Sequence, residues 1–494
     1  MDALPLALDR SNPAPLSVQL VDALAGAVGR GELALGDRLP SERGLARTLG
    51  VSRTTVVTAY RELEARGLVR GQVGRGTFVV GGDGVADDGA PFAWRGRLSA
   101  GARRFLDPTL QALVDQTGPG TISFGAGTPA LDCFPAEELR HLTDRVLRTG
   151  AGAALGLLPT TGHPALRTAI ASRHGTESRQ VLTVAGAQQG LDLIARCLLD
   201  PGDVVVMDRP GYLGAVHTFL AAGATIAGWD IERADTTELE DLLIRHAPKL
   251  IYTNPTFQNP TGRTLPIAGR QELLRLARRH RIPVVEDEPY RELPFPGIAS
   301  PPTLRELDEG GLVIQLGTFS KVLAAGPRLG WVVAPAGIVE QLALVKARTD
   351  IAGASLSQLI ARELLASGRY DNHLAVLRAE HRRRSAAMAD ALGRLLPAGA
   401  LSWRLAEGGL YVWLRLDHPR LEAPRLQAAA ARAGVVVVAG PPFYANGGGE
   451  RRVRLCFTGL PPAGIETGIQ RFASAVRALI DGPATDPTGT RPLV

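Results

Sequence analysis

The chain has 494 residues, and a single hydrophobic core stops growing at about 250–300 residues, so we expect more than one domain. Hydrophobic residues make up 45% of the sequence and charged residues 21%, a composition typical of globular domains with a large core. The formal net charge of +6 is small for this length, which excludes an argument for nucleic-acid binding from total charge alone.

The cysteines and the hydropathy pattern indicate where the protein works. Cys133, Cys197 and Cys456 are far apart and odd in number, and they lack the spacing of metal ligands. We interpret them as reduced core residues of a cytoplasmic protein, and we expect no metal. No basic-then-apolar signal begins the chain and no run of 18 apolar residues occurs, so we expect no membrane partner.

The first eighty residues have the pattern of a small helical domain that ends in a hairpin. Helical spacing of apolar residues, caps and alternation predict three helices and a two-stranded hairpin over residues 16–28, 41–50, 53–66 and 68–80. Ser41 and Ser52 are suitable N-caps, and Gly50 ends the second helix. Helix, short turn and helix is the spacing of a helix-turn-helix, and the hairpin would be its wing.

Positive charge collects in this segment. Between residues 41 and 75 there are seven arginines and three glutamates, a net charge of +4. The second helix of the pair begins with Ser52-Arg53-Thr54-Thr55, and a helix N-terminus favours phosphate because its N–H groups are free. We therefore predict double-stranded DNA as a partner, with the candidate contact residues Ser41, Arg43, Ser52, Arg53, Thr54, Thr55 and Arg75. The residues alone leave open a small helical domain with a solvated basic face.

Beyond a Gly- and Asp-rich stretch that begins at Gly81, the sequence changes character. From about residue 120, short β-branched runs alternate with longer amphipathic segments, which argues for an α/β fold with a mainly parallel sheet. The pattern predicts strands over residues 181–184, 204–207, 250–253, 284–286 and 312–316, and helices over residues 188–199 and 268–280. Ligands of such folds lie beyond the carboxyl ends of the strands.

One lysine stands out after the last of these strands. Only three of the 55 basic residues are lysines, namely Lys249, Lys321 and Lys346. An amine that can lose its proton can form an imine, whereas a guanidinium cannot. Lys321 follows two hydroxyl residues and precedes Arg328, so it suits an anchor for pyridoxal phosphate (PLP), with the hydroxyls and the arginine near the phosphate. The alternative is an exposed lysine in a Gly-rich loop.

Other polar residues follow the remaining strands. Backbone N–H groups at Gly186-Ala187-Gln188 could hold a phosphate, although many helices begin in this way. Tyr212 could stack on a ring or only pack, and Asn259 could donate to a phenolate oxygen or only form a turn. Asp287 ends a buried strand and needs a cation, which could be a protonated pyridine nitrogen or a structural arginine, and Tyr290 could bond the ring oxygen.

The N-terminal segment resembles the winged helix of the GntR regulator family. The motifs that carry the likeness are Leu39-Pro40-Ser41-Glu42-Arg43, Leu49-Gly50-Val51-Ser52-Arg53-Thr54-Thr55-Val56, Ala59-Tyr60-Arg61-Glu62-Leu63-Glu64 and Gly74-Arg75-Gly76-Thr77-Phe78-Val79. This resemblance covers about 65 residues and implies DNA binding through the second helix and the wing.

The order of motifs over residues 120–475 resembles the fold-type I PLP-dependent aminotransferases of the aromatic and aminoadipate branch. The resemblance implies an aldimine at Lys321, a pyridinium partner in Asp287 and an effector carboxylate at Arg454. It further implies that Asn259 and Tyr290 bind the ring oxygen and that Tyr212 stacks on the ring. The residues implied for the phosphate are Ala187, Gln188, Thr318, Ser320 and Arg328. One residue departs from the pattern, because Leu157 stands where the family usually has a tyrosine that reaches the partner's cofactor phosphate.

A winged helix, a linker and an aminotransferase-like domain in this order resemble the MocR-type regulators. The resemblance implies a PLP-binding transcription factor that senses an amine or amino acid by aldimine exchange at Lys321, works as a homodimer and ends in a small C-terminal α/β subdomain. We expect domains at residues 1–80 and 121–480, a linker at 81–120 and a flexible tail at 481–494. A working aminotransferase with a DNA-binding domain is the competing interpretation, and a scaffold that only dimerises is the third.

Overall fold

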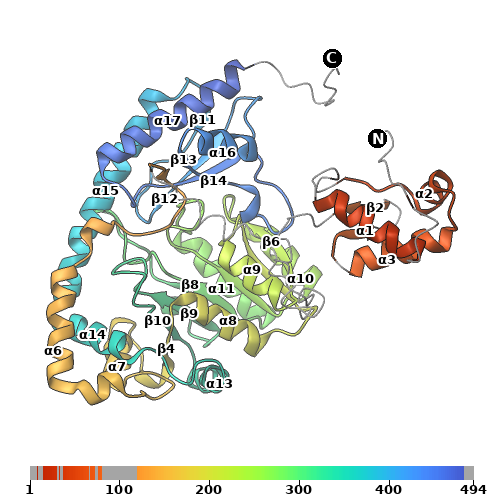
Figure 1. Ribbon diagram of the computed structural model, residues 1–494. Helices are drawn as coiled ribbons and strands as arrows, with labels where there is room; N and C mark the ends of the chain where they lie inside the picture. The colour runs from red at the N-terminus through yellow and green to blue at the C-terminus, as the bar shows by residue number, and fades with distance from the viewer. Residues whose placement is uncertain are drawn as a thin grey trace. The chain divides into compact units, whose positions relative to one another are not determined.

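The computed structural model describes Leu8, Leu33 and residues 15–29, 37–65, 67–72, 76–79 and 120–482 (Figure 1). The chain divides into two compact units, residues 1–103 and 104–494. The predicted linker, apart from Gly120, and the tail after Gly482 lie outside the described residues. Among the helices that the structure describes, none is long and apolar enough to cross a membrane.

The first unit is a three-helix domain with a two-stranded hairpin. Its elements are α1 (Leu16–Gly29), α2 (Glu42–Leu49), α3 (Arg53–Ala65), β1 (Val69–Gln72) and β2 (Gly76–Val79). The Ser41 hydroxyl accepts from Gly44 N at the start of α2, and Gly50 ends that helix in the left-handed region at φ 61°. Apolar side chains of the three helices and the hairpin form one core. The predicted helix-turn-helix with a wing is confirmed.

The second unit is built on a seven-stranded sheet with the order β4-β10-β9-β8-β7-β5-β6. Its strands are β4 (Val181–Val184), β5 (Val204–Arg209), β6 (Thr225–Asp230), β7 (Leu250–Thr253), β8 (Val284–Asp287), β9 (Val313–Thr318) and β10 (Gly330–Val333). Only β10 runs antiparallel to its neighbours, so the predicted mainly parallel sheet is confirmed. The sequence pattern missed β6 and β10.

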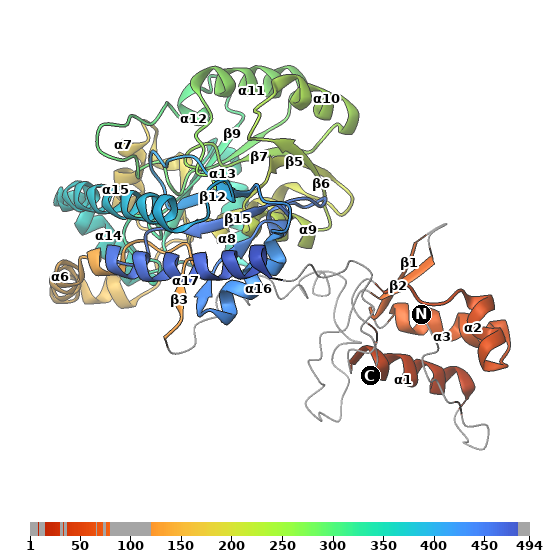
Figure 2. The same cartoon turned by 90° about the horizontal axis from the view of Figure 1, so that it is seen from above.

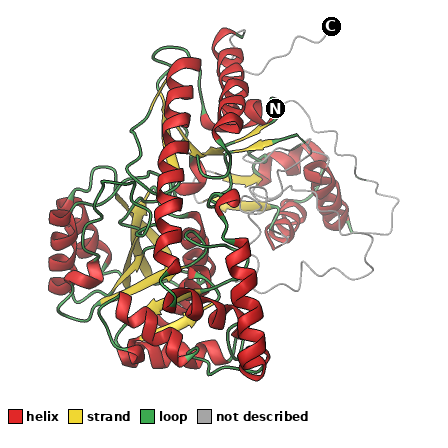
Figure 3. Cartoon of the chain, turned by 90° about the vertical axis from the view of Figure 1, so that its left-hand side faces the viewer, coloured by secondary structure: helices red, strands yellow, loops and turns green. Residues whose placement is uncertain are grey.

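Helices cover both faces of this sheet, as Figure 3 shows. Consecutive residues of one strand face opposite sides, because Val205 and Val206 belong to different cores. On one face lie α8 (Ala187–Leu198), α9 (Leu213–Ala221) and α13 (Ala336–Ala347), and on the other lie α10 (Thr236–His246) and α11 (Ile267–His280). Burial on both faces explains why the strands are continuously apolar in sequence.

A third layer of helices borders the β4 edge of the sheet. These helices are α6 (Ala136–Leu155), α7 (Pro164–Arg173) and α14 (Ser355–Ala366), and they pack on one another. Short turns of helix complete the domain at η2 (Leu131–Cys133), η3 (Ser178–Gln180) and α12 (Leu304–Leu307). Gly156 and the loop that follows it connect α6 to α7.

The C-terminal part forms a smaller subdomain, seen from above in Figure 2. Its four-stranded antiparallel sheet has the order β11 (Leu401–Ser402), β12 (Tyr411–Leu416), β15 (Arg452–Cys456) and β14 (Val438–Ala439). The helices α15 (Arg369–Leu395), α16 (Ala423–Arg432) and α17 (Pro462–Asp481), the turn η4 (Pro441–Phe443) and the paired strands β13 (Val435–Val436) and β3 (Ile122–Ser123) complete it. Because α17 includes Asp481, the helix reaches one residue into the predicted tail.

The first residue of β10 gives a test of how tightly the sheet packs. A Cβ at Gly330 would lie 2.7 Å from Gly317 O and 2.9 Å from the backbone of Gly186, and backbone cannot swing away. We therefore expect Gly330→Ala to lower the free energy of unfolding by about 1–3 kcal/mol, the usual cost of overpacking, measured by chemical denaturation. A Cβ at Gly337 in α13 would meet open space, with no atom of another element within 4 Å, so Gly337→Ala should not destabilise the fold. Equal stability of the two variants would contradict this packing argument.

Candidate functional site

A partly buried lysine lies in the loop directly after β9. The Nζ atom of Lys321 donates to the carbonyl oxygen of Gly127 at 2.7 Å. Burial lowers the pKa of Lys321 to about 8, and the nearby guanidinium groups of Arg454 and Arg328 act in the same direction. A neutral amine, which is the nucleophilic form, is therefore accessible near neutral pH.

A buried carboxylate lies at the end of the neighbouring strand β8. Asp287 Oδ2 accepts from the Tyr252 hydroxyl at 2.7 Å, while Asp287 Oδ1 has no hydrogen-bond partner among the described residues. Burial raises the pKa of Asp287 to about 6, although the Tyr252 hydrogen bond and the charge of Lys321 oppose the rise. An unpaired oxygen on a buried carboxylate calls for a cationic N–H donor.

Three loops that follow β4, β9 and the lysine form one polar corner. Gly186 has φ 81° and precedes α8, whose first N–H groups have no side-chain cap. The Arg328 guanidinium donates to Ala185 O at 3.1 Å, and a Cβ at Gly186 would lie 3.0 Å from it. Thr318 Oγ1 bonds Ser320 Oγ at 3.0 Å. Free N–H groups, two hydroxyls and a guanidinium together suit a phosphate group.

The opposite end of the site contains the predicted carboxylate arginine. Arg454 Nη1 donates to Asn259 Oδ1 at 2.8 Å and Nη2 donates to Gly125 O at 2.6 Å, while Nε has no partner among the described residues. The guanidinium carbon lies 4.5 Å from the centre of the Tyr411 ring. The Tyr411 hydroxyl in turn lies 3.3 Å from the Tyr290 hydroxyl. Asn259 is held in place by Asn254, whose Oδ1 accepts from Asn259 N at 2.8 Å.

Tyr212 connects the two ends of the site. Its hydroxyl donates to Gln188 Oε1 at 3.3 Å, and Gln188 Nε2 donates to Thr218 Oγ1 at 2.7 Å. Burial raises the pKa of Tyr212 beyond its ordinary value, and the Asp287 carboxylate adds to the rise. Tyr212 therefore remains a neutral phenol beside the carboxylate.

The structure brings the predicted residues of the second unit together around Lys321, from strand ends that are distant in sequence. Sequence reasoning missed Tyr252, Tyr411 and Gly127, which contact Asp287, Tyr290 and Lys321 respectively. Tyr252 lies inside a continuously buried strand, so its spacing carries no functional signal. Cys456, which we interpreted as a core residue, is buried, with Sγ 3.2 Å from Thr458 Oγ1.

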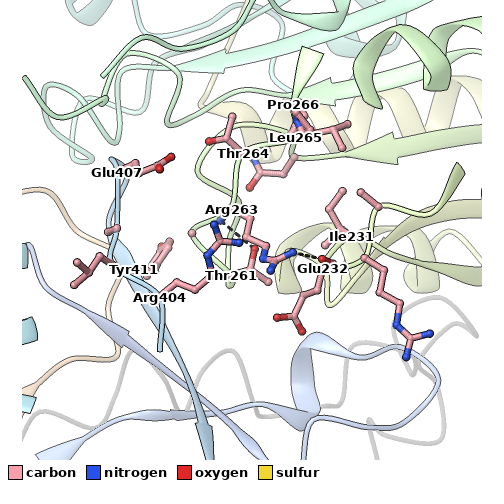
Figure 4. A pocket seen from close by; sticks show the side chains of 17 residues that line it. Ile231, Glu232, Thr261, Arg263, Thr264, Leu265, Pro266, Arg404, Glu407 and Tyr411 are labelled. Carbon is pink, nitrogen blue, oxygen red and sulfur yellow. Dashed lines mark hydrogen bonds between the residues drawn. The ribbon is translucent and has the colours of Figure 1, made fainter. Parts of the chain in front are cut away.

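A cavity of about 340 Å³ reaches the back of this site between the large domain and the C-terminal subdomain. Figure 4 shows Ile231, Glu232 and Leu265 on one side of it, and Arg404, Glu407 and Tyr411 on the other. The guanidinium of Arg263 donates to the carbonyl oxygen of Glu232 at its rim. Asn254 and Tyr411 line both this cavity and the site, so the cavity marks the boundary along which the two parts of the unit meet.

The predicted DNA-contact residues lie around α2 and α3 in the first unit. Ser52 Oγ accepts from Thr55 N at 3.1 Å, and the Arg53 guanidinium bonds Glu42 at 2.8 Å on the surface. Ser41 caps α2, so its hydroxyl is already engaged. Arg75 lies outside the described residues. Arg43 and Thr54 complete the set on these helices.

Leu157 lies in the loop between α6 and α7 and is 81% exposed. Two further apolar side chains, Leu155 and Ile351, are exposed by 76% and 64%. Hydrogen bonds connect the loop of Leu157 to the segment that contains Ile351. Thr160 Oγ1 donates to Ile351 O, and Ser355 Oγ donates to Gly156 O. The departure from the family pattern therefore places a leucine, and not a hydrogen-bond donor, on an exposed apolar surface.

The residues around Lys321 fit PLP on the observations above. Asp287 has an unpaired buried oxygen for a pyridinium N–H, the polar corner at Gly186 suits a phosphate, and Lys321 is an amine with a lowered pKa. Within the residues that the structure describes, no group of three or more His, Cys, Asp or Glu side chains could hold a metal ion.

Comparison with known proteins finds relatives for both units of the chain. Residues 16–79 match the family described as bacterial regulatory proteins, gntR family, and residues 119–472 match aminotransferase class I and II. The chain is 32% identical to the probable rhizopine catabolism regulatory protein MocR of Rhizobium meliloti, over 96% of each sequence. It is 31% identical to an uncharacterized HTH-type transcriptional regulator of Bacillus subtilis, over 95% of this chain and 98% of that protein.

A solved structure shows that the second unit has the fold of an aminotransferase. The chain superposes on alpha-aminoadipate aminotransferase from Thermus thermophilus, crystallised with N-(5'-phosphopyridoxyl)-L-leucine, with a TM-score of 0.75 and 35% identity. The match covers 79% of this chain and all of that one. Fold and site thus define a winged helix joined to a fold-type I aminotransferase-like domain, a class whose cofactor is PLP. The chain belongs to the MocR-type subfamily of GntR transcriptional regulators.

The lowered pKa of Lys321 predicts how uptake of PLP depends on pH. The neutral amine is the reactive form, so the uptake rate of cofactor-free protein should rise about tenfold per pH unit below the pKa and level off above pH 8. Absorbance at a series of fixed pH values measures this rate. Asp287→Asn removes a carboxylate that raises the pKa of Lys321, so it should move the break to lower pH. A rate that still climbs toward pH 10.5, the ordinary lysine value, would contradict the burial argument.

Proposed function

We propose that the protein is a PLP-dependent, DNA-binding transcriptional regulator that senses an amine or an amino acid at Lys321. The observation that carries the proposal is one buried site that combines Lys321, Asp287 and Arg454 in a chain of the MocR-type subfamily. When bound, PLP supplies an aldehyde carbon at which a primary amine can displace the lysine. The chain's own residues orient the cofactor and select the amine.

The proposed contacts follow from the geometry of the site. Asp287 Oδ1 would accept from the pyridinium nitrogen, and Tyr290 and Asn259 would bond the ring oxygen. The ring would lie against Tyr212. The phosphate would be held by the residues of the polar corner and the start of α8, namely Ala187, Gln188, Thr318, Ser320 and Arg328.

Arg454 would receive the carboxylate of the effector. Its Nε is unpaired and its planar fork matches a carboxylate with two charge-assisted hydrogen bonds. The effector alters DNA binding only through its different affinities for two arrangements of the protein, so recognition at Arg454 must differ between them. The wing and the start of α3 would contact the operator, and we place the protein with that DNA in the cytoplasm.

Aminotransferase activity is the second candidate function. It is supported by the 35% identity to the aminoadipate enzyme, and all residue types for the chemistry are present. An enzyme requires more from Lys321, which must carry a proton to and from the Cα of each substrate in every cycle. A sensor requires only that the effector be held and released.

We further propose a homodimer whose interface includes Leu155, Leu157 and Ile351. Three exposed apolar side chains, Leu155 at the end of α6 and Leu157 and Ile351 on two hydrogen-bonded loops, form a surface that burial would stabilise, at about 25 cal/mol per Å². Two copies would also present two winged helices to repeated half-sites, as helix-turn-helix dimers do.

The role of Arg454 can be tested by operator binding in the presence of effectors. The standard L-amino acids and simple primary amines form the panel, and DNA affinity and cofactor absorbance are measured together. Loss of a two-bond carboxylate pair costs about 3 kcal/mol, so Arg454→Ala should weaken a carboxylate effector about 100-fold and leave basal DNA binding intact. The matched control is Arg415→Ala on the paired strand β12, which removes an exposed ion pair with Asp417 and should leave the effector response unchanged. Steady turnover at about 1 s⁻¹ or faster, without any effect on DNA binding, would instead support the enzyme.

The dimer can be tested by sedimentation velocity. A double variant with Leu157→Asp and Ile351→Asp places two charges on the surface that we expect to be buried, so the protein should become monomeric at micromolar concentration. The matched control is Ile244→Asp on α10, which is 63% exposed and should remain dimeric. A double variant that sediments as the wild type does would exclude this surface as the interface.

A further inference from the structure

A second cavity lies directly behind the cofactor site, and we call it the rear cavity. Its volume is about 490 Å³, and its walls include Glu288, Thr318, Phe319, Trp331 and Tyr370. The ends of β8 and β9 form the partition, because Asp287 belongs to the site while the next residue, Glu288, lines the cavity, and Thr318 belongs to both. A molecule in the rear cavity would therefore press on the same backbone that positions the cofactor residues.

The partition contains an imbalance of charge. The fully buried guanidinium of Arg270 faces two carboxylates, Glu286 at 3.8 Å and Glu288 at 3.4 Å. Glu286 is well provided with donors, since it accepts from Leu304 N at 2.6 Å, from Arg305 N at 3.0 Å and from the Gln315 amide at 2.9 Å. Two carboxylates share one cation, so the cluster lacks one positive charge.

Of the two carboxylates, Glu288 is the one that lacks a full set of hydrogen-bond partners. Its Oε1 accepts from Thr256 Oγ1 at 2.7 Å, and its Oε2 has no hydrogen-bond partner among the described residues. Burial and the neighbouring Glu286 raise the pKa of Glu288 to about 8, while Arg270 and Arg291 oppose the rise. Burial and the charge of Glu286 thus favour the protonated form of Glu288, and such a proton would take the place of the missing cation.

Two of the three arginines that line the rear cavity are in ion pairs, and the third, Arg378, donates to a neutral carbonyl oxygen. Arg173 pairs with Glu292 and Asp371, and Arg291 pairs with Glu306. Glu292 also accepts from Tyr370, and Arg378 Nε donates to the carbonyl oxygen of Glu292. His174 accepts from Trp331 Nε1 at 3.0 Å, and burial lowers the pKa of His174 to about 4, so it is neutral.

The remaining walls are apolar. Phe319 packs edge-on against Trp331 and Tyr370, with ring centres 4.9 and 5.8 Å away. Ile170 and Leu365 add aliphatic surface. A volume of this size and a mostly apolar lining with one unsatisfied polar group are typical of small-molecule sites.

We infer that the rear cavity is a second ligand site, which takes an organic amine with one positive charge on an apolar body and uses the Glu288 carboxylate as its counter-ion. Binding would replace the proton on Glu288 by the ammonium group of the ligand, so one proton leaves as one cation enters. The site does not use the aldehyde chemistry at Lys321. This inference can therefore fail while the proposed sensing function holds, and the reverse is also possible. Because residues 287–290 form both walls, occupancy should also shift the absorbance of bound PLP.

A tertiary amine tests this site without reacting at Lys321. N,N-dimethylphenethylamine is a cation at neutral pH and cannot form an imine, and 2-phenylethanol is its neutral counterpart. Calorimetry on the full-length, PLP-loaded protein at pH 7 should show saturable binding of the amine with release of close to one proton, obtained from buffers of different ionisation enthalpy. At pH 9, above the pKa of Glu288, proton release should largely disappear.

Two variants assign the site. Glu288→Gln keeps the shape and removes the charge, so it should bind the amine at least tenfold more weakly and the alcohol unchanged. Glu407→Gln, which makes the same change in the wall of the other cavity, should bind the amine as the wild type does. No saturable binding, binding without proton release in the wild type, equal affinity in Glu288→Gln, or loss of binding in Glu407→Gln would each overturn the inference. The proton measurement uses only the wild-type chain, so it decides the question even if Glu288→Gln does not fold.

Discussion

The buried guanidinium of Arg270 fixes the strand end from which the site is built. It reaches from α11 to the carbonyl oxygens of Leu265, Pro255 and Pro302 and to the carboxylates that flank Asp287. A charge without solvent is costly unless every neighbour is matched, so this cluster tolerates little displacement. Asp287 lies between two anchored residues and inherits their rigidity. The carboxylate that we propose for the pyridinium contact is therefore positioned by the residues directly before and after it in the chain.

Burial shifts the pKa values of Lys321 and Asp287 in opposite directions. It lowers the pKa of Lys321 toward neutrality and raises that of Asp287, because in both cases the charged form loses water. The lysine thus keeps a useful fraction of free amine, and the carboxylate gains from any cationic N–H donor that completes it. The same low dielectric strengthens both effects, so one property of the fold prepares the amine and the acceptor together.

The sequence predicted those parts of the fold that local chemistry determines. Caps at Ser41 and Ser52 and the apolar runs of β4, β5, β7, β8 and β9 are local signals, and the order of motifs carried the family resemblance. The strand β6 was missed because Gly228 and Trp229 interrupt its β-branched pattern. The strand β10 is short and antiparallel, and follows the lysine loop without a helix. Tyr252 and Tyr411 reach the site with their hydroxyl groups from strands that sheet pairing places beside β8 and β15, and no single segment of sequence reveals that pairing.

With the proposed role of Arg454, strand β15 would connect effector recognition to the boundary between the large domain and the C-terminal subdomain. Arg452 and Arg454 are two residues apart, so they project from the same face of the strand. Arg452 bonds Glu232 of the large domain at 2.9 Å, and Arg454 bonds Asn259 of the same domain at 2.8 Å. A carboxylate at Arg454 must compete with Asn259 and Gly125 for the same guanidinium. Binding of a carboxylate effector at Arg454, as proposed, would therefore change one of the two polar contacts across this boundary, which is the kind of discrete rearrangement that can be transmitted beyond the site.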